Sequence, residues 1–252
     1  MSDRIAIVLQ ARTGSTRLPG KMTRAFYEGR TILQLILEEL AALFDPAEIV
    51  VATSTAENDE AIVAAARPFD CFRGSENDVL HRVTSAVADR NVDWVVRVCA
   101  DNPFLRAHFI RELLDACEPD TDYASFCLSD GKPVILSHWG LFAEVISKKT
   151  LERIEQIATS PRHREHLTSH ILDNPDMYSR KLLPLPEYVN EAVDVRLTVD
   201  TSSDFDVCQS LYADVVDEHG ARFSAEQLMS VLATRPQLHQ LMAAEIAANE
   251  KK

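Results

Sequence analysis

The segment Leu9–Met22 (LQARTGSTRLPGKM) carries three cations on a stretch without hydrophobic periodicity. Arg12, Arg17 and Lys21 share this stretch with two of the chain's seven glycines. It follows Ile5–Val8, an apolar run that predicts a buried strand. Backbone N–H groups and cationic side chains on a loop at the end of a strand can together surround phosphates. The segment therefore predicts a triphosphate site, with an exposed basic turn of no function as the alternative.

This basic loop does not match the Walker A motif, GxxxxGK[ST], which binds phosphates in P-loop kinases and ATPases. Gly14 and Gly20 have five residues between them, where the motif has four. Met22 follows Lys21, where the motif requires a hydroxyl group that binds metal. The sequence therefore disfavours a P-loop enzyme.

Two aspartates follow apolar segments that predict strands. Asp101 comes after Trp94–Ala100, and Asp200 comes after Val193–Val199. If these strands are parallel to the first one, both carboxylates lie at the sheet edge where the basic loop begins. Aspartate in such a position either caps the next helix or binds a cation. Because both face a basic loop, we expect them to bind Mg²⁺, whereas we expect Asp204 to cap the last long helix.

Three histidines, His163, His166 and His170, would share one face if their segment is a single helix. A zinc cluster is one interpretation, but the HExxH motif is missing and the neighbouring side chains disfavour a metal. We favour contacts with an anionic group of an acceptor molecule or with a second subunit, and a solvated basic face is the alternative. The residues expected to make these contacts are Arg162, Arg164, His166 and Arg180.

Strands and amphipathic helices alternate along the first half of the chain. Strands are predicted at Ile5–Leu9, Glu48–Ala52, Cys71–Arg73 and Trp94–Ala100. A capping box at Thr31–Gln34 opens a helix whose apolar stripe is Ile32, Leu33, Ile36, Leu40 and Leu43. Further helices are expected after Glu57, after Asp78, at Phe109–Cys117, at about Asp204–Glu218 and Ser224–Ala233, and toward the tail. This alternation predicts an α/β fold with a mostly parallel sheet and helices on both faces.

Composition restricts the partners of the protein. The 252 residues have a formal net charge of −13, which disfavours a general nucleic-acid binder. The five cysteines are scattered and never spaced as CxxC, as is typical of a reducing compartment. No apolar run approaches the ~18 residues of a membrane helix, and no leader pattern precedes the first strand. We expect a cytoplasmic protein that binds neither nucleic acid nor membrane. It should form a single domain, residues 1–252, with an inserted subregion at about 123–190.

The basic loop at Gln10–Lys21 (QARTGSTRLPGK) closely resembles the opening motif of the cytidylyltransferases that activate sugar acids. The resemblance is closest to the SpsF-like branch, of spore coat polysaccharide biosynthesis, in a group that includes acylneuraminate and 3-deoxy-manno-octulosonate cytidylyltransferases. Three shorter segments match in order over about residues 5–215. They are Arg97–Pro103 (RVCADNP), Arg164–Thr168 (REHLT) and Arg196–Asp204 (RLTVDTSSD). The resemblance implies a Rossmann-like nucleotide-diphospho-sugar transferase fold and a homodimer joined through the subregion at 123–190.

Carried over residue by residue, the resemblance also implies roles in the site. Arg12 and Lys21 would stabilise charge on the α-phosphate and the departing pyrophosphate. Asp101 would act in catalysis and would bind Mg²⁺ with Asp200. The residues implied to bind the nucleotide are Leu9, Gln10, Ala11, Arg12, Ser15, Arg17, Lys21, Ala52, Thr53, Arg73 and Asp101. Those expected to bind the acceptor are Arg164, His166 and Arg180.

These observations predict a Mg²⁺-dependent cytidylyltransferase that transfers CMP from CTP to an acidic sugar or similar anionic small molecule, with release of pyrophosphate. An enzyme of the same fold with a phosphorylated or phosphonate acceptor is one alternative, and a non-catalytic nucleotide-binding protein is another. A glycosyltransferase is a third, because Asp120–Asp122 spells DxD, although its place after Pro119 favours a turn. The sequence does not decide whether the nucleotide substrate is CTP or UTP. The apolar segment Val134–Phe142 favours a dimer, unless it covers the sheet of its own chain.

Overall fold

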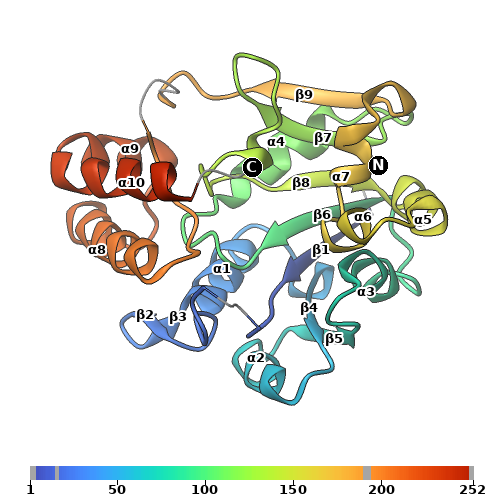
Figure 1. Cartoon of the computed structure of the whole chain (residues 1–252), viewed down its shortest axis with the longest axis horizontal. Helices are drawn as coiled ribbons and strands as arrows, with labels where there is room; N and C mark the ends of the chain where they lie inside the picture. Colours follow the sequence, from blue (N-terminus) through green and yellow to red (C-terminus); the bar gives the residue numbers. More distant parts are fainter. Residues whose placement is uncertain (1–3, 15–16, 190–193, 250–252) are drawn as a thin grey trace.

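Seven strands form one sheet at the centre of the molecule (Figure 1). Four of them, β5, β4, β1 and β6, are parallel, β8 is antiparallel to both its neighbours, and β7 and β9 are parallel to each other. The computed structural model describes residues 4–14, 17–189 and 194–249. The predicted α/β fold with a mostly parallel sheet is confirmed. The strand order is β5 (Asp70–Gly74), β4 (Ile49–Ser54), β1 (Ile5–Gln10), β6 (Trp94–Cys99), β8 (Glu144–Ser147), β7 (Tyr123–Cys127) and β9 (Arg180–Pro184).

Helices cover both faces of the sheet, as predicted. α1 (Ile32–Ala41), α2 (Glu60–Ala65) and α4 (Ala107–Ala116) pack on one face, and α3 (Val79–Ala86) and α5 (Lys148–Ile157) pack on the other. Strand β1 shows why: Ile5, Ile7 and Leu9 enter one cluster of buried side chains, whereas Ala6 and Val8 enter the other. A strand that is buried on both faces carries a continuous apolar run.

Helix α1 begins at the predicted capping box. The Thr31 side chain accepts from the Gln34 backbone N–H, and the Gln34 side chain accepts from the Thr31 backbone N–H. The helix ends at Ala41, and Leu43 is 43% exposed. Including Leu43 in the apolar stripe was therefore wrong, because the chain leaves the helix before this position.

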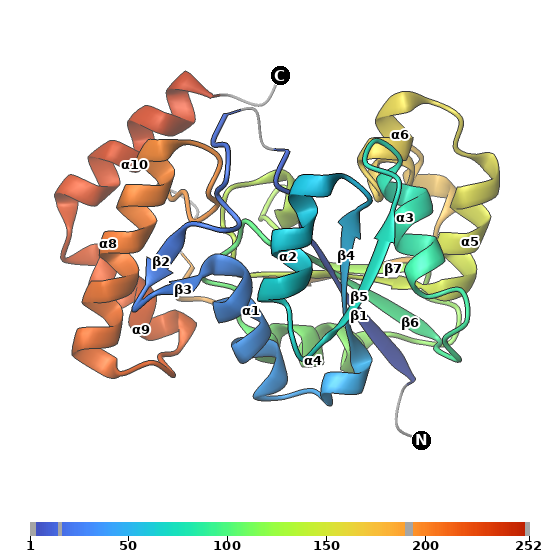
Figure 2. The ribbon, with the colours of Figure 1, turned by 90° about the horizontal axis from the view of Figure 1, so that it is seen from below.

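The C-terminal helices gather at one end of the molecule, beside a small hairpin (Figure 2). Phe26 of the hairpin packs against Phe205 and Tyr212 of the first of these helices, with ring centroids 5.3 and 5.6 Å apart. Because the hairpin follows the basic loop directly, this packing anchors the far end of that loop. The elements are β2 (Ala25–Tyr27), β3 (Arg30–Thr31), α8 (Ser202–His219), α9 (Ala225–Ala233) and α10 (Pro236–Ala248).

The strand predicted at Val193–Val199 is not observed. Val193 lies outside the described residues, and residues 194–200, all of which are described, form no strand. The Leu197 N–H bonds to the carbonyl of His138, and the Val199 N–H bonds to that of Asp101, at 2.8 and 2.9 Å. The segment is extended and largely buried, with Val195, Leu197 and Val199 among the core residues and Arg196 buried between them. It bonds to two different loops instead of one neighbouring strand.

Residues 123–190, predicted as an inserted subregion, supply β7, β8 and β9 to the central sheet. They also form the short helices α6 (Pro161–Glu165) and α7 (Ser169–Asp173). Val134, Trp139, Leu141 and Phe142 are buried within their own chain. The apolar residues cited for a dimer thus largely cover the sheet itself, and the homodimer stays a prediction. Within the described parts of the chain, no helix is long and apolar enough to cross a membrane.

Candidate active site

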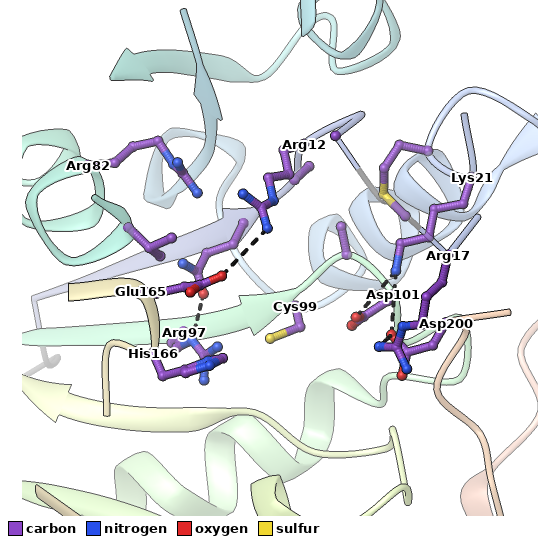
Figure 3. Close-up of a pocket in the computed structure, with 16 residues that line it drawn as sticks. Arg12, Arg17, Lys21, Arg82, Arg97, Cys99, Asp101, Glu165, His166 and Asp200 are labelled. Carbon is purple, nitrogen blue, oxygen red and sulfur yellow. Dashed lines mark hydrogen bonds and ion pairs between the residues drawn. The ribbon is translucent and has the colours of Figure 1, made fainter. Parts of the chain in front are cut away.

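A cavity of about 390 Å³ opens at the carboxyl ends of β1 and β6, where the basic loop begins (Figure 3). Parallel strands bring several predicted residues to this edge, as is usual for ligand sites in α/β sheets. The residues that line the cavity are Gln10, Ala11, Arg12, Gly14, Arg17, Lys21, Met22, Val79, Arg82, Arg97, Cys99, Ala100, Asp101, Glu165, His166 and Asp200.

The three cations of the basic loop all line this cavity. Lys21 Nζ donates to the carbonyl of Val199 at 2.8 Å and lies 3.5 Å from Asp101 Oδ2 and 3.9 Å from Asp200 Oδ1. Arg17 lies 3.1 Å from the same Asp200 oxygen. The structure therefore brings Asp101 and Asp200, which are far apart in sequence, to one ammonium group.

Asp59 fixes the start of the basic loop. Its Oδ1 accepts from the backbone N–H and the hydroxyl of Thr13 at 2.7 and 2.6 Å, and its Oδ2 accepts from the same two groups of Ser54. Burial alone would raise the pKa of Asp59, but these hydrogen bonds outweigh it and hold the pKa below its ordinary value. The sequence pattern assigned Asp59 to a helix start and missed this role.

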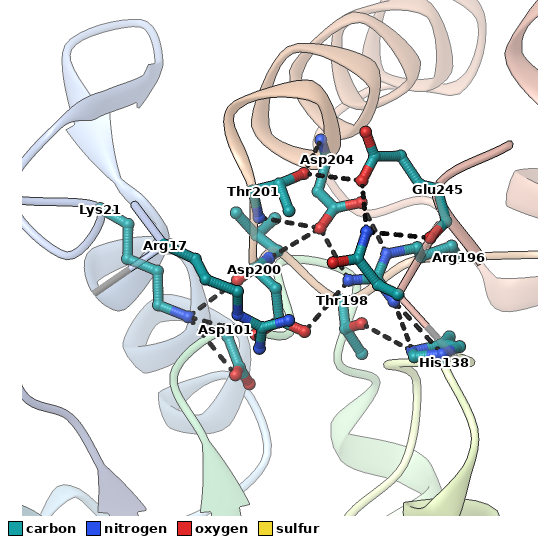
Figure 4. A network of polar contacts seen from close by, with 12 residues as sticks. Arg17, Lys21, Asp101, His138, Arg196, Thr198, Asp200, Thr201, Asp204 and Glu245 are labelled. Carbon is teal, nitrogen blue, oxygen red and sulfur yellow. Dashed lines mark hydrogen bonds and ion pairs between the residues drawn. The ribbon is translucent and has the colours of Figure 1, made fainter. Parts of the chain in front are cut away.

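A buried polar network around Arg196 holds the side chain of Asp200 in place (Figure 4). Arg196, 1% exposed, donates to both oxygens of Asp204 at 2.6 and 2.9 Å and to Asp200 Oδ2 at 3.1 Å. Its Nη1 lies 2.8 Å from the His138 ring. Asp204 was predicted to cap α8, but the N-cap is Thr201, and Asp204 closes the capping box from the third helical position. Burial would raise the pKa of Asp204, yet Arg196 and the backbone N–H groups of Asp200 and Thr201 lower it.

Arg97 joins this cavity to a second one of about 560 Å³. Its Nε donates to the Gln10 side chain at 2.5 Å, and its Nη1 donates at 2.6 Å to Glu144, which is fully buried and also accepts from the Tyr123 hydroxyl. The guanidinium is thus fixed from inside the sheet while it faces both cavities. The second cavity is lined by Arg17, Arg97, Cys99, Asp101, Asn102, Val134, Ile135, Leu136, Ser137, Gly140, Phe142, Ala143, Arg162, His166, Thr168, Ser169, Leu172, Thr198 and Asp200.

Several residues that the sequence assigned to nucleotide binding do not line the cavity. Leu9, Ala52 and Thr53 are fully buried, and the Ala52 carbonyl accepts from the Ala11 N–H at 3.3 Å. Arg73 donates to the carbonyls of Ser54 and Ala56 and to Glu60. Ser15 lies outside the described residues.

Of the residues predicted to bind the acceptor, His166 lines both cavities. Arg164 instead bonds to Asp78 and Glu155, which ties α6 to α3 and α5. Arg180 begins β9 and pairs with Tyr123, at the sheet edge opposite the basic loop. Neither arginine therefore reaches the cavities.

The three histidines do not share a helical face. His163 lies in α6 and His170 in α7, and the chain turns between these helices at His166. Among the described residues, no group of three or more His, Cys, Asp or Glu side chains could hold a metal ion. The zinc interpretation, which the sequence already disfavoured, assumed one continuous helix, and the segment instead forms two short ones.

Sequence reasoning missed Arg82 and Glu165 as residues of the cavity wall. Glu165 lies 3.8 Å from Arg12. Arg82 follows Asp78 by one helical turn and stands on a helix face that otherwise carries Val79 and Val83. A cation on an apolar face was the signal that could have identified it.

Comparisons with known proteins agree with this geometry. A family model described as "Cytidylyltransferase" matches residues 5–245. The spore coat polysaccharide biosynthesis protein SpsF of Bacillus subtilis is 30% identical over 243 residues, which cover 94% of this chain and 96% of that protein. A cytidylyltransferase from Leptospira borgpetersenii superposes with a TM-score of 0.83 at 26% identity, covering 94% of this chain and 97% of that one. A CMP:2-keto-3-deoxy-manno-octonic acid synthetase, solved with CTP, shares the fold with a TM-score of 0.63 at 18% identity, covering 84% and 99%.

Proposed function

The chain belongs to the cytidylyltransferase family, and from this premise we propose that it transfers CMP from CTP to an acidic sugar or similar anionic small molecule, releasing pyrophosphate in a reaction that requires Mg²⁺. One observation carries the proposal: Lys21, on the basic loop, contacts both Asp101 and Asp200. A fixed cation beside two carboxylates provides both a partner for phosphate oxygens and ligands for a divalent ion.

The two aspartates fit a magnesium ion. Mg²⁺ in phosphate-transfer sites commonly takes one or two carboxylates, together with phosphate oxygens and water. Asp101 and Asp200 are both partly exposed to the cavity, with 31% and 15% of their side chains accessible. When bound, Mg²⁺ would neutralise phosphate charge and orient the triphosphate.

The reaction requires little covalent help from the protein. An acceptor oxygen attacks the α-phosphorus in line, and a new P–O bond forms while the bond to the bridging oxygen breaks and its electron pair leaves with pyrophosphate. The protein must position the two reactants and stabilise the developing charge. Arg12 and Lys21, which both line the cavity, would stabilise that charge.

The second cavity supports an anionic acceptor. It adjoins the first at Asp101 and Asp200, so a molecule bound there would lie next to the α-phosphate. Arg97 and His166 face this junction and could bind the acceptor's anionic group. Val134 and Phe142 add apolar surface to the lining of this cavity.

Pyrophosphate release tests the proposal. Each nucleoside triphosphate is offered with Mg²⁺ and a panel of sugar acids, phosphorylated compounds and phosphonates, with Lys21→Ala as the control of strongly lowered turnover. We expect release with CTP and a sugar acid. Release with phosphorylated or phosphonate compounds alone would favour the alternative acceptor class. Release with no combination, despite CTP binding, would favour a non-catalytic nucleotide-binding protein.

A further inference from the structure

Arg82 is a buried cation in the wall of the first cavity. It projects from α3 and is 2% exposed. Its Nη1 donates to the carbonyls of Ser75 and Glu76 at 2.5 and 3.2 Å, while its Nε is buried and has no hydrogen-bond partner. No ion pair joins Arg82 to a carboxylate of residues 4–14, 17–189 or 194–249. A buried guanidinium in this state is unusual, because burial of an uncompensated charge is costly.

Three carboxylates act on Arg82 to raise its pKa, those of Asp59, Glu76 and Asp78. Glu76 is exposed, and the other two accept from other donors. Asp59 accepts from Thr13 and Ser54, as described above. Asp78 accepts from Arg164 at 2.5 and 2.9 Å and from the His81 N–H at 3.0 Å. Burial, followed by the positive charge of Arg12, lowers the pKa of Arg82. None of the three carboxylates forms an ion pair with Arg82 in the described residues, so its remaining N–H donors can bind a ligand.

The backbone makes room for the Arg82 side chain. A Cβ atom added to Gly74 would lie 3.0 Å from Arg82 Cγ and 2.9 Å from the Phe72 ring. Any larger residue at position 74 would displace this stem. Figure 3 shows Arg82 extending from α3 toward Arg12, across the cavity from Lys21 and Asp200.

We propose that Arg82 binds the pyrimidine base of CTP through the fork of its Nε–H and Nη2–H donors and so selects cytosine over uracil. The proposal rests on the use of CTP proposed above. Lys21, Asp101 and Asp200 occupy one end of the cavity, where the phosphates and the metal belong. Ala11 and Val79 line the cavity with Arg82, and their apolar surface suits the face of a base.

The hydrogen-bonding pattern of the bases gives the selectivity. Cytosine presents two adjacent acceptors, O2 and N3, whereas uracil presents the O2 acceptor beside an N3–H donor. The arginine side chain has N–H donors and no acceptor, so it can bond to both cytosine acceptors. Opposite uracil, one of its donors would face the N3–H donor and could not form a hydrogen bond. A pair of arginine–base hydrogen bonds discriminates by about fivefold to 150-fold, from the free energy typical of such contacts.

Calorimetric titration of the whole protein with CTP, UTP and inorganic tripolyphosphate, each with Mg²⁺, tests the proposal. Arg82→Met keeps the apolar stem beside Gly74 and removes the charge, and Arg82→Lys keeps the charge without the fork. Arg90→Met is the matched control, because Arg90 also donates to a carbonyl, that of Ala47, but pairs with Asp70 at the opposite sheet edge.

We expect wild type and Arg90→Met to prefer CTP to UTP. Arg82→Met should bind CTP about tenfold to 100-fold more weakly, lose most of that preference, and bind tripolyphosphate as wild type does. Equal losses for CTP, UTP and tripolyphosphate would overturn the proposal in favour of a phosphate contact. A lower melting temperature with an unchanged CTP to UTP ratio would reduce Arg82 to a structural residue. Wild-type protein that binds no CTP would instead refute the proposed function.

Discussion

Replacing Arg196 with methionine tests whether the buried network behind Asp200 both stabilises the fold and holds the site. Arg196 is 1% exposed and donates to Asp204, itself 3% exposed, through two nitrogens. Methionine fills much of the same volume but leaves the Asp204 carboxylate buried without its cation. Breaking a buried pair in this way costs about 3–5 kcal/mol. That loss is a large part of the roughly 5–15 kcal/mol by which a domain is stable.

Urea unfolding at pH 7, followed by tryptophan fluorescence, measures this loss. Trp94 and Trp139 are both buried, so their emission reports unfolding of the core. The matched control is Arg235→Met, because Arg235 also pairs with two carboxylates, Asp214 and Glu218, but is 34% exposed. Exposed pairs contribute about 0–1 kcal/mol, so the control should unfold near the wild-type midpoint.

The pH dependence gives a second, independent check. The pKa of Asp204 is lowered in the folded protein, so its contribution to stability is present above the ordinary carboxyl pKa of about 3.9 and is lost as the pH falls through the lowered value. In Arg196→Met, Asp204 is still buried but has lost the cation that lowered its pKa, so this pKa should rise. Acid then protonates the buried carboxylate and removes the unpaired charge. The stability difference from wild type should therefore narrow as the pH falls from 7 toward 3. A loss under 1 kcal/mol, or a difference that acid does not narrow, would refute the reasoning.

Four further single variants and one double variant test the site. Lys21→Ala should lower turnover by about 10²–10³-fold without changing the unfolding midpoint, because it removes a group that stabilises transition-state charge. Steady-state kinetics measure the loss of turnover. Asp101→Asn and Asp200→Asn should each lose most activity and require more Mg²⁺, and the double variant should be scarcely worse than the worse single variant. Magnesium titrations of activity measure both effects, and a change in stability without a loss of activity would indicate helix capping instead. Asp59→Asn should cost about 1–3 kcal/mol in urea unfolding and raise the KM for CTP, because an amide cannot accept all the hydrogen bonds that Thr13 and Ser54 donate.

Features set by one short segment could be predicted from the sequence. The capping box at Thr31 and Gln34 formed as expected, because both partners lie within one turn of α1. The strands at Ile5–Gln10, Ile49–Ser54 and Trp94–Cys99 formed where continuous apolar runs required burial on both faces. The basic loop and Asp101 then met at one edge, because parallel strands end together.

The tertiary structure determines the partner with which each charged side chain pairs. Arg164 and Arg73 belong to suggestive motifs, yet each reaches carboxylates and carbonyls outside the cavity. Arg82 belongs to no motif and stands in the cavity wall. Asp200 reaches Lys21 without a strand before it, because single hydrogen bonds to His138 and Asp101 place its segment. Local patterns fix the backbone through contacts within a few residues. The ion pairs of Lys21 and Arg164 instead join residues many positions apart, and whether those residues meet depends on how the whole chain packs.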